Sequence, residues 1–121
     1  MKRQNKVTGR RGEEVALTEL VKKGYRLLAR NWGSKFGEID LVMEDGEVVV
    51  FVEVKTKVGE DFGLPEEEVT ERKFAQVRRM GEVFLVEKGM WNRACRIDVV
   101  AIVLNRDGRM SRLDHYRSAG Y

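Results

Sequence analysis

Cysteine, proline and histidine are nearly absent from this 121-residue chain, which has one of each. The single cysteine, Cys95, cannot form an internal disulfide, which is typical of proteins kept in a reducing cytoplasm. We expect it to begin a buried strand. The single histidine, His115, cannot build a histidine-rich zinc site, and we expect it to pack in or cap the last strand. The glycine patterns of Rossmann and P-loop nucleotide sites are missing too.

Long apolar runs are also lacking. No stretch approaches the roughly 20 residues that span a bilayer. The basic start is not followed by the apolar region of a secretory signal. With 42% hydrophobic and 36% charged residues, the composition is that of a globular protein. We therefore expect one cytoplasmic domain over residues 1–121, without a membrane contact.

The most informative feature that is present is a β-hairpin, marked by Asp45-Gly46 between two apolar runs. If these two residues form the loop, Asp40 faces Phe51 and Glu38 faces Glu53. Because side chains alternate along a strand, one face of this hairpin is wholly apolar. It carries Ile39, Leu41, Met43, Val48, Val50, Val52 and Val54.

The other face gathers charged side chains at the end away from the turn. They are Glu38, Asp40, Glu53 and Lys55. A solvated strand face is the alternative interpretation, since cross-strand ion pairs of about a few tenths of a kcal/mol are common there. However, the same face holds Val42, Val49 and Phe51, which indicates that it is half covered. Crowded acids are costly unless a cation or a lysine offsets them, so the patch predicts a metal site.

The other elements follow from apolar periodicity and turn signals. They are a helix from Thr8 or Gly9 to about Lys23, a strand over 25–31, a loop over 32–36, a helix over 71–88 capped by Thr70, and strands over 96–104 and 110–116. Residues 57–68 are predicted to be irregular, with a flap there. The order α-β-β-β-α-β-β predicts an α/β fold with a mixed five-stranded sheet, since the second helix can return the fourth strand parallel to a central strand.

Charge is unevenly placed along the chain. Residues 1–11 hold five basic residues and no acid, namely Lys2, Arg3, Lys6, Arg10 and Arg11, whereas residues 59–71 hold acids and no base. We expect residues 1–8 to form a flexible basic arm. Such an arm beside carboxylates suits an anionic polymer, although a frayed, solvated terminus explains it equally well. The basic residues early in the second helix are typical of a solvated face.

Glu13 lies on the apolar stripe of the first helix, whereas Glu14 points away from it. A glutamate on a buried stripe is costly without a partner. It is either a first-turn acid near the helix N-terminus or a further acid aimed at the carboxylate patch.

Asp40 on one strand and Glu53-Val54-Lys55 on the next resemble the metal-dependent nuclease core written PD-(D/E)XK. A longer pattern over roughly residues 9–116 resembles the YraN-like family of small bacterial proteins. It comprises Gly12-Glu13 with Ala16, Gly24-Tyr25, Asn31, residues 37–41, 51–55 and 62–65, Val69-Thr70 with Lys73, and residues 96–100. The resemblance implies a restriction-endonuclease-like fold, near the archaeal Holliday junction resolvases.

The resemblance also implies a chemistry. Asp40, Glu53 and the Val54 carbonyl would hold Mg²⁺ or Mn²⁺, and Lys55 would assist the attacking water. Glu13 would be a further catalytic acid, and Glu38 and Lys73 would be auxiliary groups. Nucleic acid would be contacted by Lys73 and by the five basic residues of the N-terminal segment, Lys2, Arg3, Lys6, Arg10 and Arg11.

Three interpretations of function remain open at this stage. The first is a nuclease acting on structured or branched DNA, and the second is a nucleic-acid- or protein-binding module that keeps the fold without turnover. The third is a surface ion-pair network without a site. Whether the chain forms a homodimer or binds a protein partner is not determined by the sequence.

Overall fold

The computed structural model describes residues 2–35, 37–59 and 63–119, with the side chains of residues 2–7 and 34 left out of the description. The elements in chain order are α1 (Lys2–Lys22), β1 (Arg26–Ser34), β2 (Gly37–Asp45), β3 (Val48–Val58), the 3₁₀ turn η1 (Pro65–Glu68), α2 (Glu71–Glu87), β4 (Cys95–Leu104) and β5 (Met110–Tyr116). The predicted order α-β-β-β-α-β-β is therefore confirmed.

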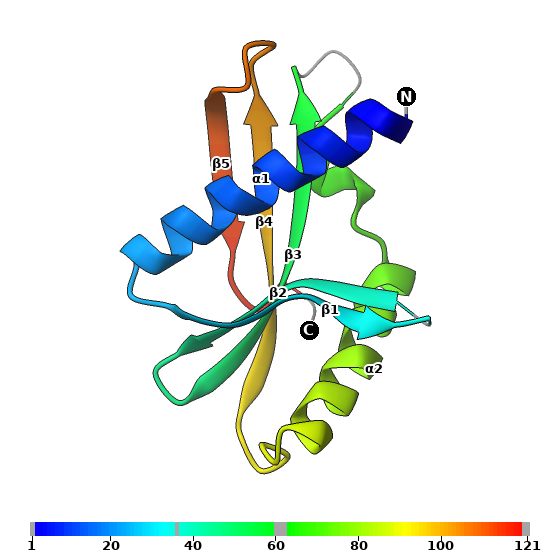
Figure 1. Cartoon of the computed structure of the whole chain (residues 1–121), viewed down its shortest axis with the longest axis vertical. Coiled ribbons are helices and arrows are strands. Elements are labelled where there is room, and N and C mark those ends of the chain that lie inside the picture. Colours follow the sequence, from blue (N-terminus) through cyan, green and yellow to red (C-terminus); the bar gives the residue numbers. More distant parts are fainter. Residues whose placement is uncertain (1, 36, 60–62, 120–121) are drawn as a thin grey trace.

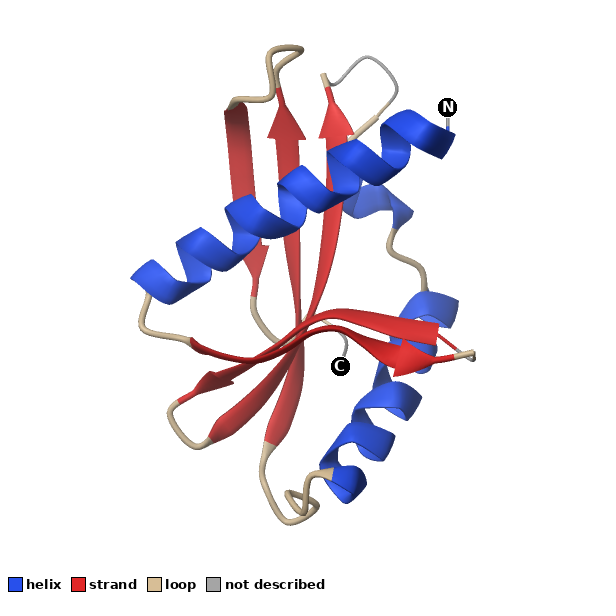
Figure 2. Ribbon diagram, in the orientation of Figure 1, coloured by secondary structure: helices blue, strands red, loops and turns tan. Residues whose placement is uncertain are grey.

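The five strands form one mixed sheet in the order β1-β2-β3-β4-β5. Only the β3–β4 pair is parallel, as predicted for a crossover through α2. The two helices cover opposite faces (Figures 1 and 2). Ala16 and Leu20 of α1 pack on Leu41, Val52 and their neighbours, whereas α2 packs on the side chains that alternate with these. The face that holds the acids is buried near the turn, at Val42, Val49 and Phe51, and open at the other end, where Glu38 is exposed, so it is half covered as predicted.

Aromatic contacts and a close approach fix α2 against the sheet. The Phe84 ring meets those of Trp32 and Phe51 edge-on, at centroid distances of 5.2 and 6.1 Å. A Cβ at Gly81 would lie 2.7 Å from the Phe51 ring, so only glycine lets the helix come this close. Thr70 caps the helix as predicted, because its hydroxyl accepts a hydrogen bond from the Lys73 amide at 3.2 Å.

The hairpin register differs from the prediction by two residues. Asp45 pairs with Val48 and Val42 with Phe51, so Gly46-Glu47 is the loop and Asp40 does not face Phe51. Gly46 has a φ of 60° at the first loop position, where a type II′ turn favours glycine. Since the shift is even, no side chain changes face through it.

The sheet forks beside this hairpin. The paired register of β2 and β3 ends at Leu41 and Val52, and beyond it β2 turns aside with β1 while β3 continues (Figure 1). We call the space between residues 37–40 of β2 and residues 53–55 of β3 the fork. The bend also carries Ile39 into the core under α2, although the sequence predicted it beside Leu41.

Several predicted boundaries were wrong. Helix α1 begins at Lys2 and not at the predicted Thr8 or Gly9. Strand β1 continues to Ser34 through the predicted loop, β3 runs to Val58, and η1 interrupts the predicted irregular stretch. Cys95 begins β4, but its side chain is exposed. No helix among the described residues is long and apolar enough to cross a membrane.

Candidate functional site

The fork brings together the two carboxylates that the sequence placed in the metal site. Asp40 Oδ2 accepts a hydrogen bond from the Val54 amide at 2.7 Å. This bond crosses the fork, where backbone hydrogen bonds between β2 and β3 have ended. The carboxyl groups of Asp40 and Glu53 are also hydrogen-bonded to each other. The Glu53 side chain is only 4% exposed, and its Oε1 is buried without a hydrogen-bond partner.

Burial and mutual repulsion make this pair hold a proton. Burial, followed by the charge of Asp40, raises the pKa of Glu53 to about 8. Burial also raises the pKa of Asp40, although the hydrogen bond from Val54 opposes the rise. At neutral pH Glu53 is therefore the protonated member and donates to the Asp40 carboxylate. A divalent cation could replace that proton.

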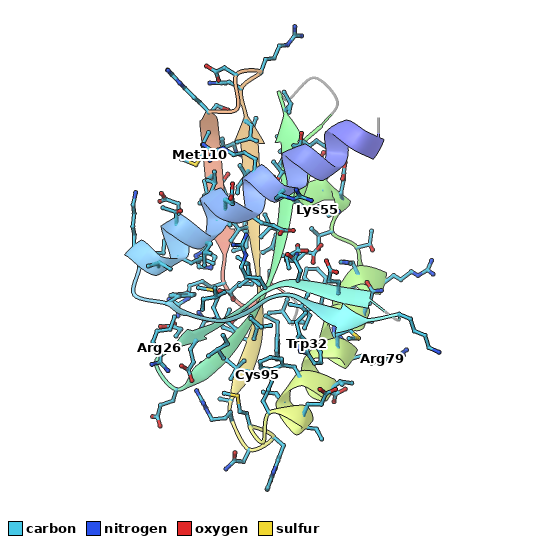
Figure 3. All side chains as sticks on the ribbon, viewed as in Figure 1. Arg26, Trp32, Lys55, Arg79, Cys95 and Met110 are labelled. Atoms are coloured by element: carbon cyan, nitrogen blue, oxygen red, sulfur yellow. The ribbon has the colours of Figure 1, made fainter. Side chains whose placement is uncertain are left out.

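Two lysines lie beside the pair. Lys73 of α2 has its Nζ 3.8 Å from Glu53 Oε2, and its charge lowers the pKa of both carboxyl groups. Lys55 is half-buried on β3, two residues beyond Glu53, and its charge also lowers the pKa of Glu53. Figure 3 labels Lys55 on β3. The two amines supply positive charge where a phosphate would approach.

A second pair of acids adjoins the first through Asn31. The Asn31 amide donates to Glu13 Oε1 of α1 at 3.0 Å and to Glu38 Oε1 of β2 at 3.4 Å. Asn31 has a φ of 47°, a left-handed conformation that asparagine tolerates better than most residues. Burial, with smaller contributions from Asp40 and Glu38, raises the pKa of Glu13. Glu13 therefore faces the fork, and Glu14 is exposed as predicted.

The predicted basic contacts are not all beside the fork. Lys73 is there, but Arg10 and Arg11 are exposed on α1, and Arg11 donates to the Gly108 carbonyl at the β4–β5 turn. The side chains of Lys2, Arg3 and Lys6 lie outside the described residues.

Two features were missed by the sequence reasoning. One is the bridging role of Asn31, whose position in the family pattern was the only signal. The other is Asp98, which is fully buried and bonded to Arg96, His115 and the Ser118 amide. These bonds tie His115 and Ser118 to β4, and they lower the pKa of Asp98 against the effect of burial. His115 packs in the last strand, as expected.

The donor set at the fork fits a magnesium-type ion with few protein ligands. Among the described residues, no group of three or more histidine, cysteine, aspartate or glutamate side chains is gathered closely enough to hold a metal. The candidate ligand atoms are the carboxylate oxygens of Asp40 and Glu53, and one of them, Glu53 Oε1, has no hydrogen-bond partner. Mg²⁺ keeps several of its waters, so two carboxylates suffice.

Comparison with known proteins shows the family. The model of "Uncharacterised protein family UPF0102" matches residues 12–102, a span that includes Glu13, Asp40 and Glu53. A UPF0102 protein of Pelotomaculum thermopropionicum is 46% identical over 94% of this chain and 95% of its own length. Similar proteins of Moorella thermoacetica and Nocardioides sp. are 40% and 45% identical, over 92% and 93% of this chain and 92% and 90% of their own lengths. The chain belongs to the UPF0102 family.

Proposed function

We propose that this protein is a metal-dependent nuclease that hydrolyses phosphodiester bonds in structured or branched DNA. One observation carries the proposal. The carboxyl groups of Asp40 and Glu53 meet at the fork, Glu53 Oε1 is buried without a hydrogen-bond partner, and two lysines lie beside the pair. Two acids that repel phosphate are of no use to a surface that only binds DNA, whereas with a cation they attract it.

Asp40, Glu53 and the Val54 carbonyl would hold Mg²⁺ or Mn²⁺. When bound, the ion supplies Lewis-acid polarisation of the phosphate and a water of lowered pKa. Lys55 would hold the attacking water and offset charge that develops on the phosphate oxygens. Lys73, 3.8 Å from Glu53, would balance the carboxylates. Glu13 and Glu38, held by Asn31, would orient water at the edge of the site.

The test is cleavage of single-stranded, duplex, flapped and four-way DNA with Mg²⁺ or Mn²⁺, comparing wild type with Asp40→Asn and with Glu14→Gln as a matched control. Glu14 is an exposed acid that faces away from the fork. We expect Asp40→Asn to abolish cleavage while keeping or improving DNA binding, because repulsion of phosphate is relieved. Glu14→Gln should cut like wild type.

Two outcomes would count against the proposal. Cleavage that survives Asp40→Asn would show that the activity belongs to a contaminant or another site. DNA binding without cleavage under any metal would leave the non-catalytic binding module as the function.

A further inference from the structure

A second surface adjoins the carboxylate pair on the α2 side of the sheet. It is a groove of about 630 Å³ between β3 and the first half of α2. Four basic side chains line it, namely Lys55, Arg72, Lys73 and Arg79, together with Gln76 and a single acid, Glu68. Lys55 and Lys73 also adjoin Glu53, so the groove opens directly onto the fork.

The spacing of the groove residues gives a row of donors along one wall. Arg72, Gln76 and Arg79 follow one another by four and three residues, so they share one face of α2. Their seven-residue span rises about 10 Å along the helix axis, at 1.5 Å per residue. A strand lying along this row would pass all three side chains, so more than one of its phosphates would come within their reach. Figure 3 labels Arg79 on α2.

The neighbouring hairpin shapes this wall. A Cβ at Gly37 would lie 2.5 Å from the amide of Gln76, so glycine at the start of β2 lets Gln76 pack against the backbone there. The donor row is thereby fixed relative to β2, the strand that carries Asp40. A strand lying along the row would be aligned with the carboxylate pair at its end.

We propose that this groove binds the sugar–phosphate backbone of one nucleic-acid strand and leads it to Asp40 and Glu53. The inference rests on the proposed function and extends it by naming the surface that holds the substrate. The sequence predicted phosphate contacts from the basic N-terminal segment and from the second helix together, and the groove narrows this expectation to α2 and the adjoining part of β3. None of the described residues that line the groove is aromatic, so bases have no stacking platform. Recognition is therefore through phosphates and independent of base sequence.

The test measures binding of fluorescein-labelled single-stranded and four-way DNA by anisotropy, in EDTA and over a range of KCl concentrations. EDTA prevents cleavage, so groove binding is measured apart from catalysis. The variant is Arg72→Gln with Arg79→Gln. The matched control is Arg106→Gln with Arg109→Gln, two exposed arginines flanking the β4–β5 turn.

Each lost phosphate contact lowers the slope of log affinity against log salt by about 0.7 for a single strand and about 0.9 for a duplex. We expect the α2 double variant to lower the slope by about 1.4 to 1.8, and the control double variant to leave it unchanged. Arg72→Lys with Arg79→Lys should restore most of the slope, since charge is what the phosphates require.

Three results would overturn the inference: an unchanged slope in the α2 variant, no DNA binding by the wild type at low salt, or equal competition by polyglutamate. The last would indicate an acidic protein as the ligand. Failure of the nuclease proposal looks different, because DNA would bind through the groove but stay uncut with Mg²⁺ or Mn²⁺. If the protein cuts DNA but the α2 double variant leaves the salt slope unchanged, the groove proposal is wrong and the nuclease proposal stands.

Discussion

Replacing Glu53 by glutamine should make the protein more stable, and the gain should grow with pH. Burial and the Asp40 charge raise the pKa of Glu53 from 4.5 to about 8. The folded state therefore binds this proton more tightly than the unfolded chain does. The contribution of Glu53 to stability is fully present below pH 4.5 and is lost as the pH rises through 8. Glutamine does not titrate, and its amide can still donate to Asp40 as protonated Glu53 does.

The magnitude follows from the two pKa values. Each unit of pH between them costs about 1.4 kcal/mol, so the loss is about 1 kcal/mol at pH 5 and about 3 kcal/mol at pH 7. Above pH 8 it levels off at about 4 to 5 kcal/mol. The Glu53 side chain is 4% exposed, so solvent screens little of this effect. Glu53→Gln should recover most of the loss at each pH.

The assay is urea denaturation at pH 5, 7 and 9 in EDTA, for wild type, Glu53→Gln and the exposed-acid control Glu14→Gln. We expect the free energy of unfolding of Glu53→Gln to exceed that of wild type by an amount that increases across the series. The control should show no such trend. A gain that stays constant with pH, or a loss at pH 9, would mean that folding does not raise the pKa of Glu53 and would refute the shared proton.

Three further predictions concern the metal, the bridge between the acids and the faces of the sheet. Mn²⁺ binding at pH 7 should release about one proton from Glu53, measured by calorimetry in buffers of different ionisation enthalpy, and release of none would contradict the exchange. Asn31→Gly should leave the melting temperature nearly unchanged, because glycine accepts the φ of 47°, yet weaken Mn²⁺ binding or cleavage by loosening Glu13 and Glu38. Val52→Asp should destabilise the fold severely because Val52 is fully buried, whereas Lys55→Ala should barely alter it; thermal melts in the reverse order would mean that the faces are misassigned.

Much of the fold was readable from local sequence because local forces decide it. Alternation of apolar side chains predicted which residues of the hairpin face α1. The even register error left that assignment intact, and only Ile39 departs from it, because the bend of β2 carries it under α2. Thr70 correctly predicted the start of α2, because its hydroxyl accepts a hydrogen bond from the Lys73 amide in the first turn. The turn before β5 and the bounds of that strand also matched.

The parts that were mispredicted depend on distant contacts. Neither the extension of β1 nor the bend of β2 is visible in the local pattern, because both elements depend on α2, through the contact of Trp32 with Phe84 and of Gly37 with Gln76. Backbones of β1 and β2 also approach so closely that a Cβ at Gly33 would lie 2.1 Å from the Gly37 carbonyl oxygen. Such close approaches are set by tertiary packing, and a sequence shows only that glycine is there to permit them.

The fork explains why the acids meet, and it gives Asp40 two roles. In a regular hairpin the β2 backbone would supply the acceptor for the Val54 amide, whereas here the Asp40 carboxylate supplies it at 2.7 Å. Removing that acceptor would leave a buried donor unsatisfied, at a cost of about 1–3 kcal/mol. Asparagine keeps an oxygen that can accept the same bond but loses the charge that a cation requires. Asp40→Asn should therefore weaken metal binding without destabilising the fold, whereas Asp40→Ala would reduce both and could not tell the two roles apart.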